Sequence, residues 1–161
     1  MAQDIFLRLS NGVKGESQDA TRHQDIEVLS YEWDVAQQSN MQLGTGGGVG
    51  RPTVGDLVIS KYTDTASPDL MYRCLKGQHF DTAQLVVRKV TGANPLEYIT
   101  FNLEQVMITG YKPTGMSNSD ARPTETVRLS FAQVEQLYVP QNDKGAQSGT
   151  ISQKFNIKQN S

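Results

Sequence analysis

The segment Asp25–Val35, with the sequence DIEVLSYEWDV, decides the fold class because apolar side chains recur in it at every second position. Such alternation is typical of a β-strand with one buried face. The phase changes once, from Ile26 and Val28 to a second apolar set on the other parity: Leu29, Tyr31, Trp33 and Val35. We therefore predict one long strand with a β-bulge near Val28.

Strand-like patterns continue along the chain in both directions from this segment. A first strand is predicted around Ile5–Leu9, ending at the turn pair Asn11-Gly12. Further strands are predicted at Asp56–Thr63, Leu85–Thr91, Glu97–Leu103, Gln105–Tyr111, Thr126–Val139 and Thr150–Lys158. The separation of two strands near Glu104 stays open. A phase change between Phe131 and Val134 predicts a bulge or a break there.

One segment has helical signals. Ser67 suits the N-cap, Pro68 the first helical position and Asp69 the positive end of the helix dipole. The spacing predicts one apolar stripe, with Arg73 and Lys76 pointing away from it; the stripe consists of Leu70, Met71, Cys74 and Leu75. Gly77 is expected to end the helix.

Three predicted strands carry apolar residues on both faces, at Leu57-Val58-Ile59, Leu85-Val86-Val87 and Val106-Met107-Ile108. In an antiparallel sheet with one solvated face, apolar and polar residues should alternate instead. One short helix can cover only part of the outer face. Either other subunits cover the outer faces, or these are central strands of a two-layer sandwich. The predicted fold is mainly β: an antiparallel two-sheet barrel or sandwich with one flanking helix (about Ser67–Lys76) and a long extended glycine-rich loop.

The composition indicates a single folded domain spanning residues 1–161, with 37% hydrophobic and 20% charged residues. The formal charge of −2 shows no excess of basic residues of the kind that binds phosphate backbones, so nucleic acid is not expected as a partner. The single cysteine, Cys74, excludes an intrachain disulfide. The first eight residues do not form a secretory signal, and no stretch approaches the ~20 apolar residues that span a bilayer. We expect synthesis in the cytoplasm and no membrane insertion.

No pattern of catalytic or metal-ligating residues stands out. His23 and His79 are isolated in the sequence, so neither a metal nor a cofactor is expected. Glu32 and Asp34 share one strand face, and a glycosidase could use a carboxylate pair of this kind. Charged residues on a solvated strand face are the far more common explanation. We assign no catalytic residue and predict that the chain is not an enzyme. An alternative is a glycan-binding or adhesive β-sandwich module that uses exposed Tyr31 or Trp33.

The run Gly44–Gly50, GTGGGVG, has five glycines but fits no nucleotide-binding motif. Its spacing differs from the dinucleotide fingerprint, and Arg51-Pro52-Thr53 follows where a P-loop needs Lys and Ser or Thr. The seventeen residues from Ala36 to Pro52 exceed the ~12–15 residues that loops of compact domains usually reach. Glycine makes such a loop costly to order, so we expect a partner to order it, with Met41 and Leu43 as apolar anchors. A plain flexible linker is the other possibility.

The whole chain resembles Hcp, the hemolysin-coregulated protein of the type VI secretion system. The resemblance rests on these segments, in order: Met1–Leu7, Val13–Ser17, Ile26–Trp33, Gly46–Gly50, Tyr62–Asp64, Ser67–Met71, Val87–Lys89, Phe131–Val134 and Phe155–Ile157. This chain has Asp34 at a position where many relatives of the family have glycine. The difference affects only the local turn or the charge of the lumen. No appended toxin domain is expected after Ser161.

The resemblance implies a structural subunit of an inner tube. Six subunits would form a ring, and rings would stack into a tube that a contractile sheath on a baseplate expels behind a spike protein. Effectors would travel in the lumen, which would also act as their chaperone. Export by this route needs no signal peptide, so the protein would be secreted from the cytoplasm.

Residue roles follow as hypotheses from this resemblance. The segment Asn40–Thr53 is the candidate ring-stacking loop, with Met41, Leu43, Gly44, Gly46, Gly47, Gly48, Gly50 and Arg51. Candidates for the lumen face are Ser30, Glu32 and Asp34. Candidates for the contact between subunits of one ring are Ser67, Asp69, Tyr72 and Arg73.

Overall fold

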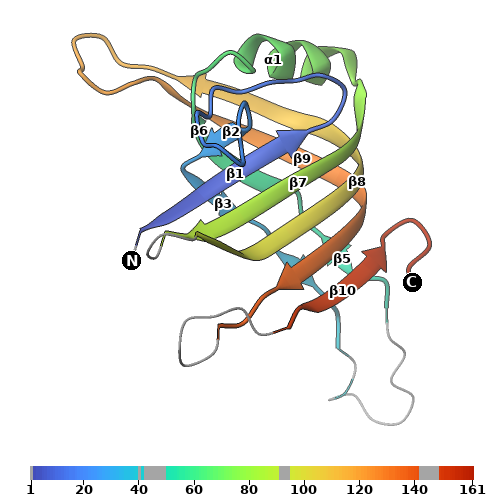
Figure 1. Cartoon of the computed structure of the whole chain (residues 1–161). Coiled ribbons are helices and arrows are strands. Elements are labelled where there is room, and N and C mark those ends of the chain that lie inside the picture. The colour runs from blue at the N-terminus through green and yellow to red at the C-terminus, as the bar shows by residue number, and fades with distance from the viewer. Residues whose placement is uncertain (1, 40, 42–49, 91–94, 142–148) are drawn as a thin grey trace.

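A long antiparallel sheet wraps round a single apolar core in this chain (Figure 1). The computed structural model describes residues 2–39, 41, 50–90, 95–141 and 149–161. The elements are β1 (Gln3–Leu9), β2 (Ile26–Val28), β3 (Ser30–Glu32), β4 (Val35–Ala36), β5 (Thr53–Val54), β6 (Leu57–Tyr62), α1 (Ser67–Lys76), β7 (His79–Lys89), β8 (Leu96–Thr114), β9 (Thr124–Tyr138) and β10 (Ile151–Asn156). The predicted mainly β class, with one short helix, is confirmed.

The strand order is β2-β1-β7-β8-β9-β6-β3, with β10 added to β9. The two ends of this order, β2 and β3, are consecutive in the chain and are joined at Leu29. β2 pairs with β1 and β3 pairs with β6, and the Leu29 N–H donates to the Ser60 carbonyl at 2.7 Å. The sheet is thereby nearly closed into a barrel.

The prediction of one continuous strand over Asp25–Val35 is wrong. The chain breaks there into β2, β3 and β4, and no bulge near Val28 joins them. The phase change is real, but its cause is a change of partner: the chain leaves β1 before Leu29 and joins β6 after it. A change of partner inverts the parity of inward side chains as a bulge does.

The two strands predicted on either side of Glu104 are one strand, β8. It bends near Gln105, whose φ is +53°, and shifts register against β9 between Ile108 and Gly110. Neither the bulge nor the break predicted between Phe131 and Val134 occurs, because β9 is continuous from Thr124 to Tyr138 and its register against β8 does not shift there. β9 pairs with β6 in its first half and with β10 in its second, so its phase changes where it turns the corner of the barrel.

The helix α1 lies over one end of the barrel (Figure 1). Its ten residues match the predicted range, and Gly77 ends it in the left-handed conformation with φ +63°. The predicted N-cap is wrong: Ala66 holds that position, and the Ser67 side chain turns into the protein. The predicted apolar stripe is also wrong in part. Leu70 is buried, whereas Met71 and Leu75 are exposed.

The core fills the barrel from end to end. Inward residues of all the long strands are buried, among them Leu7, Leu57, Ile59, Leu85, Leu103, Ile108 and Leu129. Trp33 and Tyr31 pack against Phe101 with ring centroids 6.0 and 5.9 Å apart, and Trp33 also meets Phe131 at 5.8 Å. Tyr31 and Trp33 are therefore partly buried against the core.

The doubly apolar segment Leu85-Val86-Val87 obtains its cover within the subunit. All three side chains are buried, although Val86 points to the outer face of β7 beside its partner Phe6. The polar segment of residues 14–24 passes over this face and is fixed there by arginines. Cover by neighbouring subunits is therefore unnecessary at this strand, and the hypothesis of oligomeric cover is wrong for it. No helix in the described residues could span a membrane.

Candidate functional site

Arg88 fixes the segment of residues 14–24 to the outer face of β7. Its guanidinium donates to Asp19 at 2.6 and 3.0 Å and to Asp4 at 3.0 Å, and it lies 4.9 Å from the centre of the Phe6 ring. The Arg88 side chain is 6% exposed. Because charged hydrogen bonds to a planar guanidinium are strong, this residue acts as a clamp between the segment, β1 and β7.

Arg22 reinforces the same attachment from the segment itself. It is buried, donates two hydrogen bonds of 2.8 Å to Glu97 and one of 2.9 Å to Gln84, and lies 3.5 Å from Asp25. Gln84 continues the polar row by donating to Asn102. The outer face of β1, β7 and β8 thus carries a row of hydrogen-bonded polar side chains.

Acid should weaken this clamp, because the hydrogen bond from Arg88 holds the pKa of the Asp19 carboxyl well below its ordinary value of 3.8. A carboxyl with a lowered folded-state pKa stabilises the fold above its unfolded-state pKa, and this stability is lost as the pH falls toward the folded-state value. We expect Asp19 to account for a loss of about 1 kcal/mol between pH 6 and pH 3, discounted for its partial exposure. Urea unfolding at both pH values should show a smaller pH dependence for Asp19→Asn, and an unchanged dependence would contradict this assignment.

A second polar cluster lies inside the barrel, beneath the start of α1. The Lys61 ammonium is fully buried and donates to Glu125, to Asp64 at 2.9 Å and to the Tyr62 carbonyl at 2.8 Å. Ser67 donates to Glu125 at 2.6 Å, and Tyr111 donates to the other oxygen of Glu125 at 2.5 Å. Lys61 and Glu125 are direct partners across β6 and β9. We call these five residues (Lys61, Asp64, Ser67, Tyr111 and Glu125) the Lys61 cluster.

In the Lys61 cluster the Glu125 carboxyl is held in its ionised form. Burial alone would raise the pKa of Glu125, but hydrogen bonds from Lys61, Ser67 and Tyr111 outweigh it, and the pKa lies below its ordinary value. Burial and the neighbouring Glu125 carboxylate raise the pKa of Tyr111 to about 12. Because both oxygens of the carboxylate are satisfied, the buried pair costs far less than an isolated charge would.

Sequence reasoning missed both polar networks, although alternation held a signal for the Lys61 cluster. Lys61 has the parity of Leu57 and Ile59 on β6, and Glu125 has the parity of Val127 and Leu129 on β9. A charge on the inward parity of each of two strands predicts a buried pair if those strands are neighbours. The sequence alone does not identify β6 and β9 as neighbours.

The outward side of α1 is apolar and open. Met71 is 45% exposed, Tyr72 50% and Leu75 77%. Of the interface candidates, Asp69 and Tyr72 lie on the surface, whereas Arg73 is half-buried, lies 4.5 Å from the centre of the Phe80 ring and donates to the Asn11 carbonyl. Ser67 is buried in the Lys61 cluster and so presents nothing to a neighbouring molecule. We call Met71, Tyr72 and Leu75 the α1 patch.

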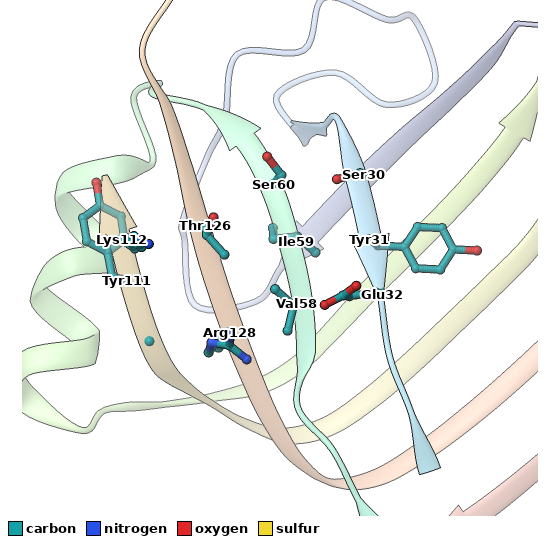
Figure 2. A pocket seen from close by; sticks show the side chains of 11 residues that line it. Ser30, Tyr31, Glu32, Val58, Ile59, Ser60, Tyr111, Lys112, Thr126 and Arg128 are labelled. Carbon is teal, nitrogen blue, oxygen red and sulfur yellow. The ribbon is translucent and has the colours of Figure 1, made fainter. Parts of the chain in front are cut away.

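The lumen candidates Ser30 and Glu32 lie on the outer face of a four-stranded wall formed by β8, β9, β6 and β3. Figure 2 shows their side chains on this face, while Tyr31 between them points the other way. The face holds a shallow concavity of about 510 Å³. Its other outward residues are mainly small or charged: Val58, Ser60, Gly110, Lys112, Thr126 and Arg128. Asp34 is exposed beyond the end of β3, and its carbonyl accepts the Gly55 N–H at 2.9 Å.

At both edges of this wall the outer strand lacks a further strand partner within the described residues, and α1 lies beside the β8 edge in Figure 2. Among the described residues, β3 pairs with β6 alone, and β8 beyond Thr109 pairs with β9 alone. Glu32 lies on one edge strand and Lys112 on the other, at opposite sides of the face in Figure 2. Open edges are templates for pairing with another chain. The wall therefore has an acidic edge and a basic edge.

The structure fixes the base of the candidate stacking loop. β4 and β5 pair as a separate two-stranded sheet, and the Trp33 indole N–H donates to the Gly55 carbonyl at 2.9 Å. Arg51 donates to the carbonyls of Ile157 and Lys158 at 2.9 and 3.3 Å. Met41 is 84% exposed, and Gly50 is exposed. The predictions for Leu43, Gly44, Gly46, Gly47 and Gly48 fall outside the described residues.

Within the described part of the chain, no group of three or more His, Cys, Asp or Glu side chains could hold a metal ion. The concavities found there are shallow, and the two buried ionic networks are internally paired. What the surface offers is an exposed apolar helix side, open strand edges of opposite charge and a loop on a fixed base. These features define the class as a β-barrel protein with unpaired strand edges and an exposed apolar helix side.

Comparison with known proteins gives the family. The sequence profile described as type VI secretion system effector, Hcp, matches residues 6–138. The chain is 41% identical to protein hcp1 of Pseudomonas aeruginosa over 161 residues, which cover 99% of this chain and 98% of that protein. It is 39% identical to the solved Hcp1 of Salmonella typhimurium, with a TM-score of 0.80 over 99% and 98% of the two chains. A structure described as a type six secretion system protein is 28% identical, with a TM-score of 0.92 over 99% of both chains.

The chain therefore belongs to the Hcp family of type VI secretion system effectors. The resemblance inferred from the sequence is confirmed over the full length.

Proposed function

We propose that this chain is the structural subunit of a type VI secretion tube. Six copies form a ring, rings stack into a tube, and the tube is expelled by a contractile sheath on a baseplate, with a spike protein at its tip and effectors in its lumen. The protein performs no catalysis and leaves the cell through this machine. The observation that carries the proposal is the full-length similarity to Hcp proteins.

The open edges of the wall supply a reason for ring formation. If copies stand side by side, β3 of one copy meets β8 of the next, and the wall continues from subunit to subunit. Such a heterologous contact closes into a ring when the rotation between copies is right. Glu32 of one copy would then approach Lys112 of the next. The α1 patch, with Asp69, Tyr72 and Arg73, adds a second contact in the same ring.

Negative-stain electron microscopy of the purified chain tests the proposal. Rings with an open centre, and tubes at high concentration, are the expected images. The alternative, a glycan-binding or adhesive module, predicts compact particles without a channel. Two observations speak against that alternative: Tyr31 and Trp33, its candidate sugar-stacking residues, pack against the core aromatic residues Phe101 and Phe131.

Reversing one charge at the proposed edge contact should weaken the ring. In Glu32→Lys or Lys112→Glu a like-charge pair replaces an attractive one at each of the six contacts, with about 1 kcal/mol at stake per contact. We expect at least about a tenfold rise in the concentration at which rings dissociate. The double variant Glu32→Lys/Lys112→Glu should recover most of the loss. Sedimentation at several concentrations measures this, with Glu16→Lys, an exposed charge away from the wall, as control. No recovery in the double variant would remove the contact from the proposal.

In this ring, Ser30, Glu32 and the rest of the wall's outer face line the lumen, with Asp34 at its border. Small and charged side chains on this face suit brief contacts with varied cargo, because few large apolar groups are present to hold a partner tightly. Charge reversal at Asp34, which takes no part in the edge contact, should change which effectors co-purify with the ring. Identical cargo recovery from Asp34→Lys and from the unmodified ring would take Asp34 out of the lumen.

A further inference from the structure

The helix α1 is attached to the barrel by a small contact. Of its ten residues, Ser67 and Leu70 are buried, while the α1 patch faces outward. Cys74 packs partly against the core, and Arg73 contacts Phe80 and the Asn11 carbonyl. A helix of this length gains little stability by itself, so these few contacts determine whether it stays in place.

Polar contacts make up much of that attachment. Ser67, the first residue of α1, donates to Glu125 at 2.6 Å, and its oxygen lies 3.3 Å from the Lys61 ammonium and 2.9 Å from the Asp64 N–H. Asp64, in the connection from β6, also accepts the Ala66 N–H at 3.0 Å. The Lys61 cluster therefore ties the start of the helix and its connection to two neighbouring barrel strands.

Both connections of α1 are short and partly exposed, although Ala66 in the first of them is buried. On the side of β6, residues 63–66 connect the strand to the helix, and Thr63 and Thr65 are exposed. On the side of β7, Gly77 has φ +63°, and no atom lies within 4 Å of the position that a Cβ would take there. A segment with few buried apolar contacts opens at a lower free energy than the core around it.

We propose that the Lys61 cluster is a latch that sets how often α1 undocks as a unit from a barrel that stays folded. The latch positions the α1 patch, so a docked helix is the form able to contact a neighbouring copy. That last point rests on the proposed ring, whereas the undocking itself concerns the single chain. The sequence provides one probe for each part: Cys74 is the single cysteine, on α1, and Trp33 is the single tryptophan, in the barrel.

Thiol labelling and tryptophan fluorescence test the latch. In Glu125→Gln the shape of the side chain is kept but its charge on Lys61 is lost. We expect the labelling rate of Cys74 to rise about tenfold or more, the factor expected when a charged hydrogen bond is lost, with an unchanged Trp33 emission spectrum. Lys61→Met should behave alike. The matched control is Leu129→Ala, which removes core volume on the same strand, four residues from Glu125; its partners across the sheet are Leu57 and Ile108, outside the cluster. In the control, Cys74 should gain reactivity only together with a change at Trp33.

Hydrogen exchange of the unmodified chain covers the case in which the variants do not fold. The free energy of the opening through which the α1 amides exchange should be lower than the free energy of the opening that exposes the β7 and β8 amides. Equal protection of α1 and these strands, or unchanged Cys74 labelling in a folded Glu125→Gln, would overturn the latch. Labelling is followed at concentrations below and above ring formation. If the chain forms no rings but Cys74 is labelled faster in Glu125→Gln, the result contradicts the proposed function and leaves the latch supported.

Discussion

Deletion of residues 44–50 is expected to leave rings intact and to abolish tubes. The deleted residues include five glycines, and ordering glycine costs more backbone entropy than ordering any other residue. A loop that becomes ordered on contact contributes to stacking only if that contact outweighs this cost. Without the loop, the proposed contact between rings has nothing to form it.

The structure gives reason to expect that the deletion is local. β4 and β5 pair below the loop through Val35–Val54 and Ala36–Thr53, and Arg51 is held by the carbonyls of Ile157 and Lys158. None of these contacts involves a deleted residue. A variant in which the glycines become serines at unchanged length separates length from flexibility and should still form tubes, at the same or a lower concentration, because serine loses less backbone entropy than glycine on ordering. Electron microscopy should show single rings from the deletion variant, and normal tubes from it would rule out the loop as the stacking element.

The replacement Arg88→Met should lower the free energy of unfolding by about 3 kcal/mol. The clamp is 6% exposed, and its loss leaves Asp19 and Asp4 without their partner while residues 14–24 lose their main attachment. Breaking a buried ion pair costs about 3–5 kcal/mol, and the lower end applies because the two carboxylates are partly solvated. Methionine keeps an apolar stem over Phe6, so lost packing contributes little.

Denaturant unfolding measures this loss, and two further variants sharpen it. Lys154→Met removes a surface pair with Glu104 at 3.9 Å, in which both side chains are about half exposed, and should cost less than about 0.5 kcal/mol. The double variant Arg88→Met/Asp19→Asn should lose less than the sum of its two single variants, because they share one interaction. Additive losses, or equal losses for Arg88→Met and Lys154→Met, would contradict the role of Arg88 as a clamp.

Alternation predicted most of the strands, because burial of one face of a sheet imposes a period of two on the sequence. It could not separate a bulge from a change of strand partner at Leu29, since both invert the inward parity. For a similar reason, alternation left open whether one strand or two run through Glu104. A strand that turns the corner of a barrel keeps its hydrogen bonds while the face it buries changes.

The polar parts of the molecule were harder to predict than the apolar ones. Ser67 has the chemistry of an N-cap, yet its hydroxyl bonds to Glu125, 58 positions along the chain. A hydroxyl can hydrogen-bond to a buried charge in place of capping its own helix. Whether a buried charge lies nearby depends on which strands become neighbours. The same holds for Arg88 and Asp19, 69 positions apart. The assembly residues rest on the family resemblance, because a surface that a partner covers looks like any exposed surface in a single chain.

The mass of the purified chain in solution tests the central claim most directly. Native mass spectrometry at micromolar concentration should give a species of about 107 kDa, six times the 17.8 kDa of one chain. The charge-reversal variants Glu32→Lys and Lys112→Glu should shift this population toward smaller species. A single species of 17.8 kDa at every concentration tested would contradict the ring, and with it the tube.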